Sequence, residues 1–408
     1  MSRNAALSEL LSGAAYAEPG APLVERLGGR EPEALLRPDS TEEVAAVLRW
    51  ASDEGVGVVT IGSGTHLLGE APEDRFVVLS TDRLTGLEIY EAADLTLTAR
   101  AGTPLLDLGK TLSEHGQWLP FDPPDVGART LGGLVASGES GPLWMGYGAL
   151  RNHVLGAVLV TGDGRILRLG GRVVKNVAGF DLLKVVVGSR GRLGVVTSVC
   201  LRAFPEPVGE RVLVRRGRDL AELVPLALAV GTAPSQPASV VLLTPVPGMS
   251  EGAALIVRLH GAEATVEHDQ AVLERHGDTR FERLEDPGPL LEAAGTQSYG
   301  RGVMLLLSVL PTRLPEAIAA IRAAAGDADL VIDTYGGAIR AAVGEGEAED
   351  ATRLRAAVER LGGTITVHAP PGARSVWERT PRTPEEAELE SGVLSAFDPR
   401  GVLWPRPS

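Results

Sequence analysis

The sequence predicts an α+β fold of two regions, and three observations lead to this prediction. The chain has 408 residues, too many for one typical core, and 44% of them are apolar, as in packed globular proteins. Its first half interleaves short strands with helices and glycine-rich turns. After Pro205-Glu206-Pro207 the pattern changes to strands that alternate with longer helices. We therefore expect an α/β region over residues 1–205 and an α+β region over residues 206–394.

The first elements lead the chain to a glycine-rich turn. Residues 1–36 are expected to be helical and peripheral. Ser40 or Thr41 is predicted to cap a helix over Val44–Ser52, and Gly55 to end it. The run Val56–Ile61 then predicts a strand, so the turn that follows lies at the carboxyl end of a strand, where α/β folds bind ligands.

That turn, Gly62-Ser63-Gly64-Thr65-His66, is a weak signal alone. It is neither a Walker A loop nor a Gly-x-Gly-x-x-Gly that opens a helix. Further strands and a helix follow it, and a Thr161–Gly164 turn predicts a hairpin. The strands are expected at Phe76–Ser80, Leu87–Tyr90, Leu95–Ala99, Val154–Val160 and Arg165–Leu169, and the helix at Pro104 onward.

The most informative stretch runs from Phe121 to Arg151 and contains a second set of glycines. Gly132, Gly133, Gly138 and Gly141 have no Cβ, so a ligand could approach their backbone amides, which form anion-binding nests in such turns. No Lys or Arg lies between Thr130 and Leu150. We interpret the stretch as backbone recognition of a phosphate-bearing cofactor; the alternatives are a tight surface loop and glycine-mediated packing. Two such turns suit a cofactor with two phosphates.

The two turns resemble the FAD-binding domain of the vanillyl-alcohol oxidase/PCMH flavoproteins. Ile61–Gly69 is similar to that family's first pyrophosphate loop and Thr130–Gly141 to its second. Val174–Leu182, Val187–Thr197 and the tail Phe397–Pro405 resemble the hydroxy-acid dehydrogenase branch, above all the FAD-binding subunit of glycolate oxidase. The resemblance is specific over residues 35–205 and the last ten or so.

The resemblance implies a PCMH-type FAD-binding domain of two α/β subdomains, with residues 395–408 returning to it, and a ferredoxin-like α+β cap. Three departures stand out: Phe180 replaces a usual tyrosine and Trp404 a usual asparagine. Thr65 holds the place of the histidine that carries covalent FAD in some members, and His66 comes one later. We therefore expect non-covalent FAD.

The family motif also assigns roles to individual residues. Lys175 is expected to place positive charge near the flavin; the alternative is a solvated lysine whose stem packs on the sheet. Arg151 either positions a cofactor-side loop or forms a salt bridge. The backbone of Val195 is expected to contact the flavin. The predicted cofactor-binding residues are Ile61, Gly62, Ser63, Gly64, Thr65, His66, Pro123, Thr130, Gly132, Gly133, Ser137, Gly138, Ser140, Gly141, Arg151, Asn176 and Val195.

Oxidising a 2-hydroxy acid needs a base, a cation for the carboxylate and a hydride acceptor. Catalytic members of the branch place histidines and a glutamate around a metal in the second domain. Of His260, His268, His276 and His368, we keep His368, at a strand end, as the candidate catalytic residue beside Lys175; His260 and His268 are not spaced for ligation on one helix face. No metal is predicted.

Composition excludes other classes. The net charge of −14 argues against a nucleic-acid partner. The one cysteine, Cys200, excludes an internal disulfide and a chain-encoded iron–sulfur cluster, and its apolar surroundings predict a buried thiol. We expect no signal peptide at the N-terminus, and no apolar run approaches the ~20 residues of a membrane span. We expect a cytoplasmic protein that is not an integral membrane protein, with membrane association only through partners.

Three functional hypotheses follow. The first is a FAD-binding subunit of a glycolate or 2-hydroxy acid oxidase complex, passing electrons to flavoprotein and iron–sulfur partner subunits. The second is a self-sufficient FAD-linked D-lactate or D-2-hydroxy acid dehydrogenase. The third is a non-catalytic flavoprotein scaffold, which would not need both glycine turns.

Overall fold

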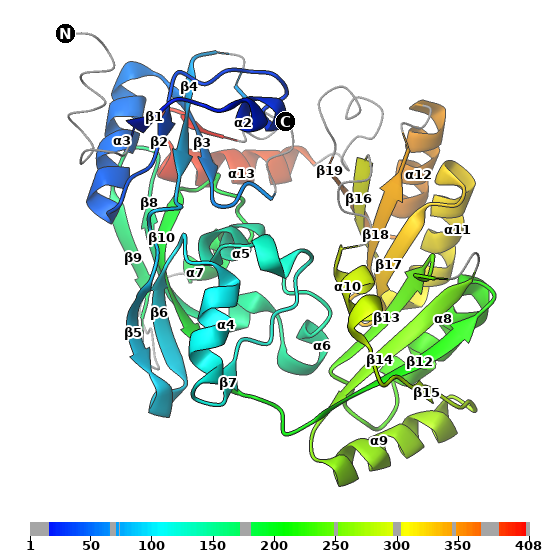
Figure 1. The fold of residues 1–408 in the computed structure, drawn as a ribbon. Coiled ribbons are helices and arrows are strands. Elements are labelled where there is room, and N and C mark those ends of the chain that lie inside the picture. Colours follow the sequence, from blue (N-terminus) through cyan, green and yellow to red (C-terminus); the bar gives the residue numbers. More distant parts are fainter. Residues whose placement is uncertain are drawn as a thin grey trace.

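The structure is a computed structural model of the chain. It describes residues 16–65, 71–72, 74–171, 181–248, 252–296, 303–344, 348–368 and 383–404. Two regions lie beside each other: the first holds two larger sheets, and the second holds one large sheet (Figure 1).

The first sheet of the first region is mainly parallel. Its order is β1-β2-β4-β3-β20, and β1 alone is antiparallel to its neighbour. The strands are β1 (Tyr16–Ala17), β2 (Leu35–Leu36), β3 (Gly57–Ile61), β4 (Phe76–Ser80) and β20 (Leu403–Trp404), with helix α2 (Ala21–Arg26) between β1 and β2. The prediction that residues up to 36 are helical was therefore wrong in part. Strands of two residues carry no periodicity and form because they pair with a sheet edge.

The second sheet is antiparallel, in the order β5-β6-β10-β8-β9. Its strands are β5 (Leu87–Glu91), β6 (Thr96–Arg100), β8 (Val154–Val160), β9 (Ile166–Gly170) and β10 (Val195–Arg202). It is accompanied by α4 (Leu105–Ser113), α5 (Leu131–Ser137), α6 (Trp144–Tyr147), α7 (Leu183–Val186), the 3₁₀ turns η1 (Ala92–Asp94), η2 (Val126–Ala128) and η3 (Leu150–Asn152), and the small β7 (Gln117–Trp118) and β11 (Phe204–Pro205) pair. The hairpin predicted around Thr161–Gly164 is confirmed.

Helix α3 (Thr41–Glu54) joins the two sheets. Its Ser40 cap accepts a hydrogen bond from the Glu43 amide at 3.2 Å, and Gly55 ends it in the left-handed conformation. Its buried face contacts strands of both sheets: Val44 and Leu48 share one core cluster with Val58, Val160 and Val195. Burial of this apolar face fixes the first sheet, and hence the end of β3, against the second.

The second region is one antiparallel sheet of two βαββαβ units, in the order β15-β12-β14-β13-β17-β18-β16-β19. The first unit comprises β12 (Glu210–Gly217), α8 (Leu220–Gly231), β13 (Ser239–Thr244), β14 (Ala253–His260), α9 (Glu263–His276) and β15 (Glu282–Arg283), followed by α10 (Gly288–Thr296). The second comprises β16 (Val303–Ser308), η4 (Pro311–Arg313), α11 (Leu314–Ala325), β17 (Asp329–Asp333), β18 (Ala338–Val343), α12 (Ala348–Arg360) and β19 (Thr364–His368). The units join edge to edge through β13 and β17.

The predicted ferredoxin-like topology thus occurs twice. No internal repeat is visible in the sequence because the repeat is one of topology, filled by different apolar residues. The alternation of strands with longer helices that the sequence predicts for this region is confirmed.

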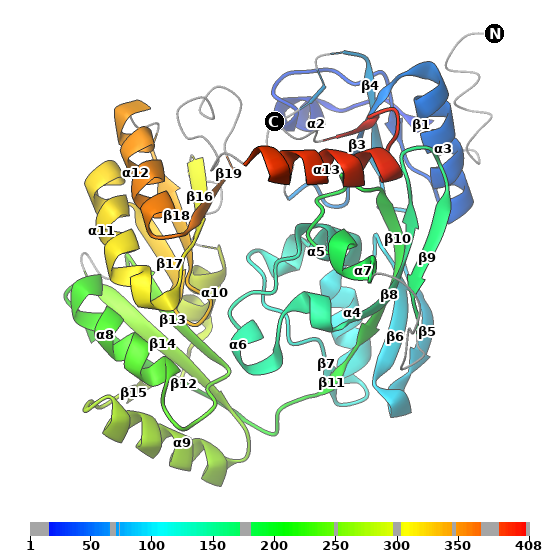
Figure 2. The same ribbon diagram turned by 180° about the vertical axis from the view of Figure 1, so that it is seen from behind.

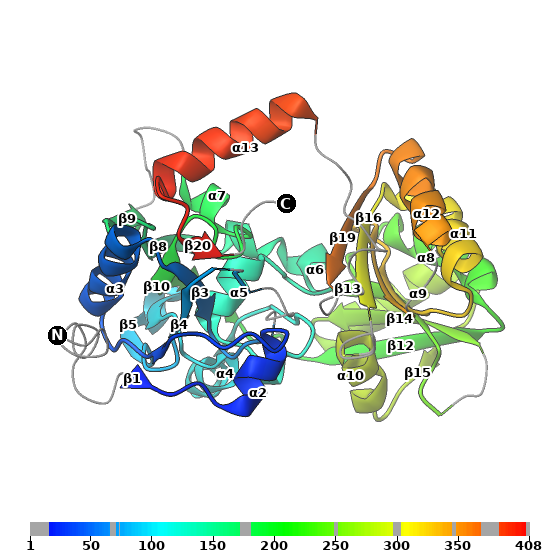
Figure 3. The same cartoon turned by 90° about the horizontal axis from the view of Figure 1, so that it is seen from above.

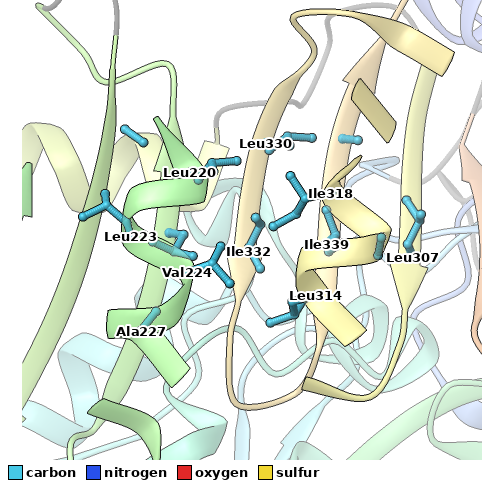
Figure 4. Close-up of a cluster of buried hydrophobic side chains, with 14 of the residues drawn as sticks. Leu220, Leu223, Val224, Ala227, Leu307, Leu314, Ile318, Leu330, Ile332 and Ile339 are labelled. Atoms are coloured by element: carbon cyan, nitrogen blue, oxygen red, sulfur yellow. The ribbon is translucent and has the colours of Figure 1, made fainter. Parts of the chain in front are cut away.

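The two faces of this sheet differ. Helices α8, α9, α11 and α12 cover one face, where Leu223, Ile318 and Ile332 belong to the largest core cluster (Figure 4). Strand residues Val241 and Ile256 point to the other face and pack with Leu290 of α10. That face is turned toward the first region (Figure 1).

Helix α13 (Pro384–Phe397) brings the chain back. Figures 2 and 3 show it running from the second region across the first. Glu390 forms an ion pair with Arg192, and Phe397 is buried in the core of the second sheet. The Asp398 carboxylate then accepts the amides of Val402 and Leu403, which turns the chain into β20 beside β3.

Candidate active site

The two glycine segments meet. A Cβ on Gly62 would lie 2.3 Å from Oγ1 of Thr130, so only glycine allows this approach. The end of β3 therefore lies directly against the start of α5, although 68 positions separate the two residues. We call this contact, formed by Gly62–Gly64 and Thr130–Gly133, the glycine junction.

Local hydrogen bonds fix both sides of the glycine junction. The Thr81 amide donates to the Ile61 carbonyl at 2.9 Å, which holds the end of β3 against β4. Thr130 caps α5, its Oγ1 accepting the Gly133 amide at 3.2 Å. The hydroxyl that touches Gly62 is thus already oriented by its own helix.

The first segment fits an anionic group. Within the described residues, the amides of Gly62, Ser63 and Gly64 have no hydrogen-bond acceptor. The guanidinium of Arg26, in α2, donates to the carbonyls of Ser63 at 3.4 Å and Gly64 at 3.3 Å and so places a positive charge over the turn. The hydroxyls of Ser63 and Thr65 lie 3.0 Å apart. Unused amides beside a cation suit a phosphate.

Several backbone amides of the second segment, Thr130–Gly141, already donate hydrogen bonds within the protein. The Gly132 amide donates to the Ala101 carbonyl at 2.6 Å, and its missing Cβ admits Ala101. The Gly138 amide ends α5 at Leu134, and the Ser140 hydroxyl accepts the Leu150 amide at 2.8 Å. A Cβ on Gly141 would lie 2.1 Å from the Asp122 carbonyl. These residues shape the segment, and their cofactor contacts stay predictions.

Arg129 organises this segment and was not predicted. Its side chain is 2% exposed and forms an ion pair with Glu139 at 2.6 Å. Its Nε donates to the Pro124 carbonyl at 2.6 Å and its Nη1 to Ser137 Oγ at 3.4 Å. Because Pro124, Ser137 and Glu139 all belong to the Phe121–Gly141 stretch, one buried cation holds that stretch together.

The remaining predicted residues lie in different places. Pro123 lines a cavity described below, Arg151 is exposed in η3, and Val195 is buried at the start of β10. His368 pairs with Met304 at the end of β19. His66, Lys175 and Asn176 lie outside the described residues. The roles assigned to all of these stay predictions.

A cavity of about 430 Å³ lies between the two regions. Both regions contribute walls, and we call this space the interregion cavity. Its walls are mostly apolar, with Arg258 and several carboxylates among them. It is lined by Asp122, Pro123, Asp125, Val126, Gly127 and Pro142 of the first region and by Ser239, Val241, Ile256, Arg258, Leu291, Glu292, Ala294 and Gly295 of the second.

A chain of hydrogen bonds crosses the boundary beside this cavity. Arg258 of β14 donates to Asp122 at 2.9 Å and to Glu210 of β12 at 2.6 Å. His260 Nε2 lies 3.1 Å from Glu210, and its Nδ1 lies 2.8 Å from the Tyr147 hydroxyl. A carboxylate only accepts, so Nε2 donates to Glu210 and Nδ1 accepts from Tyr147 when the imidazole is neutral.

Burial and charge alter the acidities in this network. Burial raises the pKa of the Asp122 carboxyl to about 7, against the opposing effect of Arg258. Burial also raises the pKa of Asp333 to about 6, although the Trp144 indole donates to it. The hydrogen bond from His260 is the main cause that lowers the pKa of Glu210 to about 2. One carboxyl of the cavity wall therefore titrates near neutrality.

This network was not predicted from the sequence, in which His260 was not kept as a candidate site residue. A signal was present: Arg258 and His260 are two apart in an otherwise apolar strand, so they lie on one face of the sheet. Their partners Glu210, Asp122 and Tyr147 come from other elements, so the spacing of residues along the chain does not predict these contacts. Within the described residues, no group of three or more His, Cys, Asp or Glu side chains is placed to hold a metal.

The structure is thus an α+β fold in which two glycine-rich segments meet at the end of a parallel strand. Comparison with known proteins makes this specific. Residues 32–170 match the family described as FAD binding domain, so this part of the chain is similar to that family. Alkyldihydroxyacetonephosphate synthase has the same fold, with a TM-score of 0.70 and 17% identity over 93% of this chain and 78% of that one.

Curated relatives of the chain are named as oxidase subunits, dehydrogenases and FAD-linked oxidoreductases. Glycolate oxidase subunit GlcD of Bacillus subtilis is 27% identical over 92% of this chain and 88% of its own length. Glycolate oxidase subunit GlcE of Escherichia coli is 46% identical over 30% of this chain, and the D-lactate dehydrogenase of Archaeoglobus fulgidus 38% identical over 42%. These last two alignments span 35% and 39% of the relatives' own lengths. Among the described residues, no helix is long and apolar enough to cross a membrane.

Proposed function

We propose that this protein binds FAD non-covalently and oxidises a small 2-hydroxy acid, of the glycolate or D-lactate kind, as one subunit of an oxidase complex. The observation that carries the proposal is the contact between Gly62 and Thr130, which brings two amide-bearing segments together at the end of a parallel strand. Bound there, the flavin would accept two electrons. The chain's own residues would hold the diphosphate at Gly62–Thr65 and orient it through Thr130.

The subunit role is supported by two features. Relatives named as glycolate oxidase subunits match the chain, one of them over most of its length. The chain's single cysteine, Cys200, is buried, so an iron–sulfur cluster that accepted electrons from the flavin would lie on another protein. We propose a cytoplasmic complex with a second flavoprotein and an iron–sulfur subunit. Similarity to D-lactate and D-2-hydroxyglutarate dehydrogenases favours a second candidate, a self-sufficient dehydrogenase.

Purification of the chain alone tests these proposals. Acid precipitation is expected to release the flavin into the supernatant; a yellow pellet would show covalent attachment. The subunit role predicts a yellow protein that reduces a dye with glycolate or D-lactate slowly or not at all, and faster when the partner subunits are added. Rapid turnover by the isolated chain would favour the second candidate, and a colourless protein that cannot be loaded with FAD would refute both.

A further inference from the structure

The interregion cavity offers a cation with free donors. Nε and Nη1 of Arg258 are bonded to Glu210 and Asp122, while Nη2 has no acceptor among the described residues. A guanidinium carries five N–H donors, so Arg258 keeps at least two for a ligand. Its side chain is 14% exposed, and it lines the cavity. Such a guanidinium binds a carboxylate well because its fork matches the two oxygens.

The rest of the cavity selects for size and shape. Its volume of about 430 Å³ is at the lower end of small-ligand pockets. Val126, Val241 and Ile256 make an apolar wall beside Arg258. A ligand with one carboxylate and a short apolar substituent satisfies both surfaces.

Asp122 faces the same space. Its Oδ1 accepts the Leu143 amide at 2.9 Å, and its Oδ2 receives Arg258. Its side chain is 27% exposed. The other charged groups around it are carboxylates: Asp125 on its own loop, Glu292 of α10 and Asp333 at the end of β17. Burial and the Asp333 carboxylate favour the protonated form of Asp122, whereas Arg258 and the Leu143 amide favour its ionised form.

On the basis of the proposed function, we propose that Arg258 binds the carboxylate of a 2-hydroxy acid in the interregion cavity and that Asp122 accepts the proton of its hydroxyl group. A bound carboxylate adds a negative charge beside Asp122 and shares its one counter-ion, so Asp122 becomes a stronger base when substrate is present. The O–H proton would pass to Asp122, and bound FAD would supply the oxidant that takes the C2 hydrogen with its electron pair, so that the carbinol carbon becomes the carbonyl of a 2-oxo acid.

The test measures binding and proton uptake, with pyruvate as the probe. Calorimetry on the FAD-loaded chain at pH 8, in two buffers of different ionisation enthalpy, gives both the Kd and the protons taken up. Because Asp122 titrates near pH 7, it is ionised in the free protein at pH 8 and should take up close to one proton as pyruvate binds. Acetone, which lacks the carboxylate, should not bind.

Variants assign the effects. Arg258→Met should weaken pyruvate binding by at least about tenfold, and Arg258→Lys, which keeps the charge and the fold, by less. Asp122→Asn should bind pyruvate without proton uptake. Asp125→Asn is the matched control: it removes a carboxylate from the same cavity, its left-handed backbone tolerates Asn, and it should behave as the natural chain. Thermal unfolding and flavin content check that each variant is folded.

The outcomes separate this inference from the proposed function. If pyruvate does not bind, or if Arg258→Met binds it unchanged, the carboxylate site is refuted even when the chain oxidises 2-hydroxy acids. If Asp122→Asn takes up protons as before, Asp122 is not the acceptor. If pyruvate binds at Arg258 with proton uptake but no 2-hydroxy acid reduces the flavin, the site stands and the proposed function fails.

Discussion

The glycine junction and the interregion cavity differ in which atoms form them, backbone atoms at the junction and side chains at the cavity. At the junction, missing side chains bring backbone amides together, and Gly62 touches Thr130 inside one region. At the cavity, long charged side chains from both regions reach one another, as Arg258 does with Asp122 and Glu210. The first is a backbone surface, which we propose for the diphosphate of FAD. The second depends on how two regions pack, so it is the place where substrate preference can vary.

The largest expected effect concerns Arg129, a buried cation of the first region. Replacing Arg129 by Met removes its ion pair with Glu139 and its hydrogen bonds to Pro124 and Ser137. Breaking a buried ion pair costs about 3–5 kcal/mol. We expect this loss in the free energy of unfolding, measured by urea denaturation, together with loss of FAD.

The control is Arg37→Met, whose ion pair with Asp82 is 39% and 40% exposed. An exposed pair contributes about 0–1 kcal/mol, so little should change. The double variant Arg129→Met/Glu139→Met should recover part of the stability. If Arg37→Met and Arg129→Met lower the free energy of unfolding equally, the buried ion pair of Arg129 does not stabilise the first region more than an exposed pair does.

What the sequence could predict follows the same division. The helix start at Ser40 or Thr41 and the Thr161–Gly164 hairpin depend on neighbours in the chain, and both predictions are confirmed. The contact of Arg129 with Glu139 and the row of Arg258 and His260 against Glu210 depend on tertiary packing. A charged residue looks the same in sequence whether it is solvated or buried, so these partners became visible only in the structure.

The second prediction concerns Gly141 of the second glycine segment, which lies against Asp122 of the interregion cavity. Gly141 has a φ of +75°, and a Cβ there would lie 2.1 Å from the Asp122 carbonyl. Gly141→Ala should cost about 2–3 kcal/mol, because the left-handed conformation and the close contact both penalise a side chain. It should also weaken pyruvate binding, since Asp122 must move.

Gly55→Ala separates the two causes of that loss. Gly55 has a φ of +65° but no atom within 4 Å of the added Cβ, so it carries the conformational cost alone. If both variants lose the same stability, the contact with Asp122 does not matter.

The third prediction isolates the glycine junction. Gly62→Ala must push Thr130 aside, and Thr130 can move only by giving up its cap on α5, worth about 1 kcal/mol. We expect that loss of stability and a lower flavin content per protein, read from the visible absorbance of flavin. Gly109→Ala, in α4 with no atom near the added Cβ, is the control and should keep its flavin. Full flavin content in Gly62→Ala would show that the junction does not hold the diphosphate.

The smallest effect tests whether the far end of the charged network matters to the cavity. Tyr147→Phe removes the hydroxyl that lies 2.8 Å from His260 Nδ1 and should cost about 1 kcal/mol in unfolding free energy. Flavin content should stay unchanged, because Tyr147 contacts Trp118, Phe204 and His260, which lie outside the glycine junction. Tyr335→Phe, at a tyrosine that is 49% exposed, is the control for loss of a hydroxyl alone. If Tyr147→Phe alters the affinity of Arg258 for pyruvate, the His260 imidazole transmits the change to Arg258 through Glu210. If the affinity is unchanged, Asp122 and Glu210 position Arg258 without the help of Tyr147.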